Sequence, residues 1–77
     1  MPILLNDYYK VRAFQTLVFK IPWQVEIYLQ QDRCIVDARK SLGVLSLNLD
    51  NNVNLIMINC SEEDMSNYFS LFTSFEP

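Results

Sequence analysis

The strict alternation of apolar and polar residues from Trp23 to Gln30 constrains the fold of this chain most strongly. Side chains of a strand point to opposite faces in turn, so this stretch predicts a strand with one buried and one wet face. The same alternation returns from Val53 to Ile58, which indicates a central strand. Sheets with one solvated face are typical of open-faced α+β proteins with helices on the other face. The apolar positions of the first stretch are Trp23, Val25, Ile27 and Leu29.

The segment before this alternation predicts a short strand and then a helix. Pro2–Asn6 is an apolar run that suits a buried strand, and Asn6 and Asp7 then supply helix N-cap side chains. Pro22 is expected to end the helix, because the residue before a proline disfavours the α conformation. The expected buried face of this helix comprises Val11, Phe14, Val18 and Ile21.

The rest of the chain predicts a hairpin, a short helix, the central strand and a last helix. Arg33–Ala38 is the returning strand after a turn at "QQDR", and Asp37 or a residue just after it caps a helix of two or three turns. Ser61 and Asp64 form a capping pair before the last helix. The order is therefore β-α-β-β-α-β-α, with a ferredoxin-like split βαβ as the second choice. The short helix carries Leu42, Leu45 and Leu49 on one face, and the last carries Met65, Tyr68, Phe69, Phe72 and Phe75.

Composition excludes several classes of function. The 77 residues suit a single domain, and a net charge of −3 without a basic run argues against nucleic acid. No apolar run reaches membrane-spanning length, so we expect a cytoplasmic protein without membrane contact. Without histidine, no catalytic triad or zinc set can form, and we expect no cofactor and no metal. Cys34 and Cys60 are expected as buried reduced thiols, and the acidic run Glu62–Asp64 as a charged first helical turn.

The stretch "RKSLGVLSL", Arg39–Leu47, together with this order of elements resembles the HPr family, the phosphocarriers of the bacterial sugar phosphotransferase system. Val36–Ala38 and Ser46–Leu49 are similar to divergent clostridial HPr-like proteins. The resemblance covers residues 1–77 as one domain. It implies an open-faced sandwich, a four-stranded antiparallel sheet with helices on one face.

The residue that carries phosphate in this family is a histidine at the start of the first helix, and it is missing here. The alignment puts Asp7, with Asn6 beside it, at that place. The expected function is therefore a binding or regulatory module that cannot form phosphohistidine, and not an enzyme. Alternatives are a phosphorylation target using Asp7 or Ser41, and a homodimerising module. The family's regulatory serine aligns with the Lys40–Ser41 region, where a solvated or capping serine is the simpler interpretation.

The family binds its partners through the short helix, and this implies a partner-binding surface here. Leu42 and Leu45 would form an apolar centre with a basic rim, and the alternative is that both leucines are buried in the core. Trp23 is expected in the core. The implied partners are proteins: enzyme I, acceptor domains of the phosphotransferase system, or a regulator, with the chain a monomer or weak homodimer. The candidate surface comprises Tyr8, Tyr9, Lys10, Arg39, Leu42 and Leu45, with Lys40 on the rim.

Overall fold

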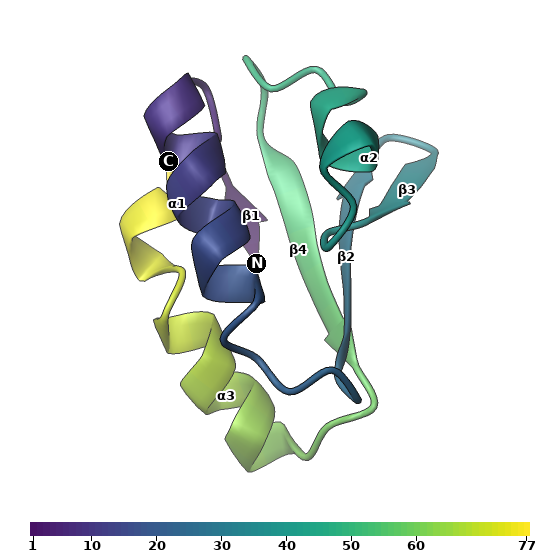
Figure 1. Cartoon of the computed structure of the whole chain (residues 1–77), viewed down its shortest axis with the longest axis vertical. Helices are drawn as coiled ribbons and strands as arrows, with labels where there is room; N and C mark the ends of the chain where they lie inside the picture. Colours follow the sequence, from purple (N-terminus) through teal and green to yellow (C-terminus); the bar gives the residue numbers. More distant parts are fainter.

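A computed structural model describes all residues, 1–77, and contains a four-stranded sheet, three α-helices and a 3-10 helix (Figure 1). The elements follow the order expected from the sequence, with the 3-10 helix added at the end. They are β1 (Pro2–Ile3), α1 (Tyr8–Val18), β2 (Glu26–Gln31), β3 (Cys34–Asp37), α2 (Ser41–Leu45), β4 (Val53–Ile58), α3 (Glu62–Ser70) and η1 (Thr73–Phe75).

The sheet has the strand order β1-β4-β2-β3, and every neighbouring pair is antiparallel. The predicted central strand, β4, does lie between β1 and β2. A ferredoxin-like order would instead place the first and third strands in the centre, so the second choice is wrong. The α+β fold class with an open four-stranded antiparallel sheet is confirmed.

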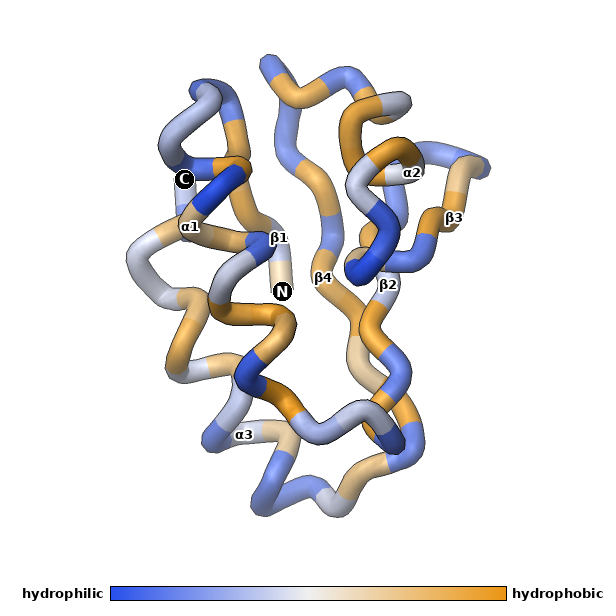
Figure 2. The backbone as a smooth tube through the Cα atoms, viewed as in Figure 1, coloured by the Kyte–Doolittle hydropathy of each residue, from blue (hydrophilic) through white to orange (hydrophobic).

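The register of the two central strands explains why one face of the sheet is buried. Ile27 pairs with Met57 and Leu29 with Leu55, and all four side chains are buried. The residues between them point to the opposite face. In Figure 2 the first half of β4 alternates between orange and blue, whereas its second half is orange throughout because Ile56 and Ile58 are also apolar. The helices cover the buried face, and none combines the length and apolar content needed to cross a membrane.

Helix α1 begins as predicted and ends earlier than predicted. Asp7 is the N-cap, and its Oδ1 accepts a hydrogen bond of 2.8 Å from the backbone N–H of Lys10. The helix ends at Val18, not at Pro22, because the chain tightens into two successive turns there. In these turns the N–H of Lys20 and of Ile21 bonds the carbonyl three residues back. Ile21 is buried through this turn and not through the helix.

An aromatic cluster fastens the C-terminal segment to α1. The rings of Phe14 and Phe72 have centroids 5.4 Å apart, and Phe75 meets Phe14 edge to face at 6.1 Å. Both C-terminal rings are buried but lie beyond α3, which ends at Ser70, so the predicted apolar face is only partly helical. The Ser61 hydroxyl accepts from the N–H of Asp64, as predicted. Helix α3 itself contains no fully buried residue.

Two expected core residues are exposed. Trp23 is 81% exposed because residues 22–25 form a turn, in which Val25 N–H donates to Pro22, and β2 begins only at Glu26. Cys34 was expected inside and is exposed, and it lies at the start of the edge strand β3. Cys60 is half-buried, and both thiols are free.

The "QQDR" turn is shorter than expected: only Asp32 and Arg33 separate β2 from β3, and Asp32 has φ of 55°.

Truncation of Phe14 tests the aromatic cluster. We expect Phe14→Ala to lower the free energy of unfolding by about 3–5 kcal/mol, because it leaves a cavity between two packed rings. Phe19→Ala is the matched control, since that ring is 70% exposed and should change stability by less than about 1 kcal/mol. Urea unfolding of the two variants measures the difference. Equal losses would show that the cluster contributes no specific packing.

Ionisation of Tyr28 should make stability depend on alkaline pH. The hydroxyl of Tyr28 donates a 2.7 Å hydrogen bond to Glu26, and this bond, partial burial and the carboxylates of Glu26 and Asp37 raise the pKa of Tyr28. Because the folded pKa exceeds the unfolded value of about 10, this stabilisation is complete below pH 10 and is lost as pH rises through the folded pKa.

Unfolding measured against pH should therefore show an alkaline decline that Tyr28→Phe reduces. Tyr9→Phe is the control, because Tyr9 is 83% exposed. An alkaline decline that Tyr28→Phe leaves intact would contradict this account.

Candidate interaction surface

Helix α2 approaches β3 so closely that its packing face is set by one glycine. A Cβ placed on Gly43 would lie 3.3 Å from the Cβ of Val36. That separation is tighter than nine in ten natural Cβ contacts, so a side chain here would require Val36 or the helix to shift by a few tenths of an ångström. Val44, next to the glycine, is fully buried and anchors the helix to the core.

This anchoring turns two leucines of α2 to solvent. Leu42 lies two residues before Val44, about 200° around the helix, and is 84% exposed. Leu45 lies about 100° from Val44 and is 56% exposed. The alternative that both leucines belong to the core is therefore wrong. The expected helix of two or three turns contains only five residues, and Leu49 is half-buried beyond its end.

The turn from β3 into α2 is held by Asp37, although not as the predicted cap. Its Oδ1 accepts from the N–H of Arg39 at 2.9 Å, and its carbonyl accepts from the N–H of Lys40 at 3.1 Å. Lys40 is the N-cap residue and provides no side-chain bond to the helix. Asp37 therefore shapes the chain before the helix and leaves the side chain of Lys40 free at its start.

Arg39 is a structural bridge and not the free rim cation that the resemblance implies. Its guanidinium donates to the carbonyls of Val25 at 2.6 Å, Pro22 at 3.0 Å and Ile21 at 3.2 Å. Three bonds from one planar cation match the fork of donors that arginine offers. The bridge ties the start of α2 to the connection between α1 and β2.

That connection carries two exposed aromatic side chains, which the sequence did not identify as surface residues. Phe19 is 70% exposed and Trp23 is 81% exposed. Lys20 is exposed between them. The signal available in the sequence was Pro22, because a proline beside a strand favours a turn over a continued alternation.

The first turn of α1 forms a separate exposed group. The rings of Tyr8 and Tyr9 meet edge to face at 6.2 Å, and Arg12 donates to the Tyr8 hydroxyl at 2.9 Å. Lys10 donates to Asn6 at 3.1 Å. In Figure 1 this turn lies at the upper left and α2 at the right, with β4 between them. The structure therefore does not bring Tyr8, Tyr9 and Lys10 together with Leu42 and Leu45.

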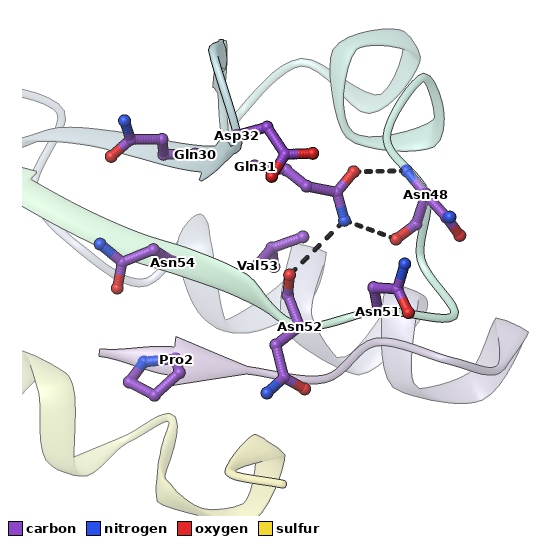
Figure 3. Close-up of a pocket in the computed structure, with 9 residues that line it drawn as sticks. All are labelled: Pro2, Gln30, Gln31, Asp32, Asn48, Asn51, Asn52, Val53 and Asn54. Carbon is purple, nitrogen blue, oxygen red and sulfur yellow. Dashed lines mark hydrogen bonds between the residues drawn. The ribbon is translucent and has the colours of Figure 1, made fainter.

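A polar hollow of about 260 Å³ lies beyond the C-terminal end of α2, beside the loop that leads to β4 (Figure 3). Within it, the amide of Gln31 donates to the carbonyl of Asn48 at 2.6 Å and accepts from the N–H of Asn48 at 2.7 Å. The bonds tie the end of β2 to the loop after α2, so this glutamine is used structurally. The lining of the hollow is almost entirely polar and comprises Pro2, Gln30, Gln31, Asp32, Asn48, Asn51, Asn52, Val53 and Asn54.

The positions aligned with family phosphorylation sites have ordinary local roles. Asp7 caps α1, and Ser41 is the exposed first residue of a five-residue helix. No group of three histidine, cysteine, aspartate or glutamate side chains is placed to hold a metal ion.

Comparisons of this chain with protein-family models, curated proteins and solved structures find no match. The candidate site is the exposed face of α2, because Leu42 and Leu45 are exposed there on a helix that Val44 anchors.

Replacement of Arg39 tests whether it holds this surface together. We expect Arg39→Met to lower the free energy of unfolding by about 1.5–3 kcal/mol, because three carbonyls lose a charged donor. The fluorescence of Trp23 should also change, since its turn is released. Lys40→Met is the matched control, with an exposed side chain and an expected effect within about 0.5 kcal/mol. Equal stability of the two variants would exclude the bridging role.

Proposed function

We propose that this protein is a non-catalytic binding module that contacts a protein partner through the exposed leucines of α2. The observation that carries the proposal is that Val44 is the only buried residue of α2, while Leu42, at 84% exposure, points to solvent. Apolar side chains on the exposed face of a helix anchor such helices in hydrophobic grooves of their partners. Lys40 at the start of the helix adds a cation beside it, which favours a partner with acidic residues around an apolar pocket.

The rigidity of α2 supports a role in binding. Its start is tied through Arg39, its middle is packed on β3 at Gly43, and the loop after it is tied through Gln31. A pre-ordered helix loses little conformational entropy when it docks. The leucines are therefore presented in one arrangement before any partner arrives.

The resemblance to the HPr family supports a partner class. It favours enzyme I or an acceptor domain of the phosphotransferase system, and with it a cytoplasmic location. Because the chain has no histidine, it would occupy such a partner without accepting a phosphoryl group on an imidazole. The proposed role is that of a competitor or regulator.

An NMR titration with the HPr-binding domain of enzyme I tests this proposal. We expect amide shifts concentrated on residues 40–45, and a loss of affinity of about 30-fold or more in Leu42→Asp, because a charge would enter the apolar contact. Leu71→Asp is the matched control: Leu71 is 43% exposed and lies at the C-cap of α3.

Two results would contradict the proposal. A flat titration would exclude enzyme I as the partner, and equal binding by both leucine variants would exclude α2 as the surface. Incubation with enzyme I and phosphoenolpyruvate should leave the mass unchanged. An increase of about 80 Da would instead show a phosphorylation target using Asp7 or Ser41.

A further inference from the structure

The two edges of the sheet differ in how they are protected. At the β1 edge, the N–H of Leu4 donates to the carbonyl of Phe75 at 2.8 Å, so the C-terminal segment covers the chain there. At the other edge, β3 pairs only with β2. Figure 1 shows β3 at the right margin of the molecule with no element beyond it. An uncovered strand edge is a template for pairing with another strand.

The phase of the hydrogen bonds shows which groups of β3 face outward. Ala38 N–H donates to the carbonyl of Ile27 at 3.0 Å, and Val36 pairs with Leu29 in the same register. Because bonded and non-bonded positions alternate in an antiparallel pair, Val36 also points its backbone toward β2. The backbone N–H and C=O of Ile35 therefore point away from the sheet, as does the N–H of Asp37.

This edge is short and ends at the charged residue Asp37, but other devices against pairing are absent. Residues 34–37 contain no proline and no lysine, and the register of β3 with β2 has no bulge. Ile35 is 58% exposed on the face of the sheet that carries no helix. Its neighbours at positions 33 and 37 carry opposite charges.

We propose that β3 pairs antiparallel with β3 of a second copy of this chain, about a twofold axis at Ile35. In this register Ile35 exchanges both backbone hydrogen bonds with the partner's Ile35. Arg33 then lies opposite the partner's Asp37 on each side of the axis, and opposite charges in this position are favourable. The two four-stranded sheets become one continuous sheet.

Charge selects this register over its nearest alternative. An axis at Val36 would also match outward-facing backbone groups. It would place the apolar side chain of Ile35 against the partner's Asp37 and would leave Arg33 without an acidic residue opposite it, so both favourable charge pairs would be lost. Arg33 is exposed, so its side chain is available for the pairing with the partner's Asp37.

Sedimentation equilibrium and amide hydrogen exchange test this pairing. Strand edges of this length bury little area, so we expect a weak dimer that becomes populated as the protein approaches about 1 mM. Exchange of the Ile35 amide should slow as concentration rises, because that N–H gains a partner only in the dimer. Leu42→Asp should dimerise normally, which separates this inference from the proposed function of α2.

Arg33→Asp should weaken the dimer by about tenfold or more, because two like-charge pairs replace two favourable ones. Lys20→Asp is the matched control, with the same change in charge on the connection between α1 and β2, and should dimerise as the original chain does. Three results would overturn the pairing: a monomer at about 1 mM, a dimer without added protection of the Ile35 amide, or an unchanged dimer in Arg33→Asp.

Discussion

The antiparallel pairing of β2 with β4 is the interaction on which the rest of this structure depends. It aligns Ile27 with Met57 and Leu29 with Leu55, and so produces one continuous apolar face. The helices pack on that face because it is the largest surface that must leave water. In a chain of 77 residues there is material for only one such core, and seventeen buried apolar side chains form it as a single cluster.

The interaction surface follows from how α2 is attached to this core. The helix is too short to be stable alone, so its position is determined by contacts at its ends and middle. Gly43 permits the close approach to β3, and Arg39 and Gln31 secure the segments on either side. With Val44 buried, the helical repeat leaves Leu42 nearly opposite the core. The exposure of an apolar residue here is a consequence of packing and not of disorder.

Much of the fold was predictable because the sequence signals are local and mutually consistent. The alternation in β2 and β4, the Asp7 cap and the Ser61 cap each depend on residues close together in the chain. The errors occurred where long-range contacts compete with local pattern. Trp23 fits the alternation of β2, yet β2 pairing reaches only as far as Glu26, and the turn after Pro22 sends the indole outward.

By itself, the sequence determined the order of the elements, the buried faces of the two central strands and the absence of any chemistry that requires histidine. These follow from side-chain periodicity and residue type, which need no knowledge of distant contacts. Only the tertiary structure decided that Arg39 is a bridge, that the first turn of α1 lies apart from α2, and that the β3 edge is open while the β1 edge is covered. Each of these depends on residues far apart in the chain, whose proximity is set by packing of the whole core.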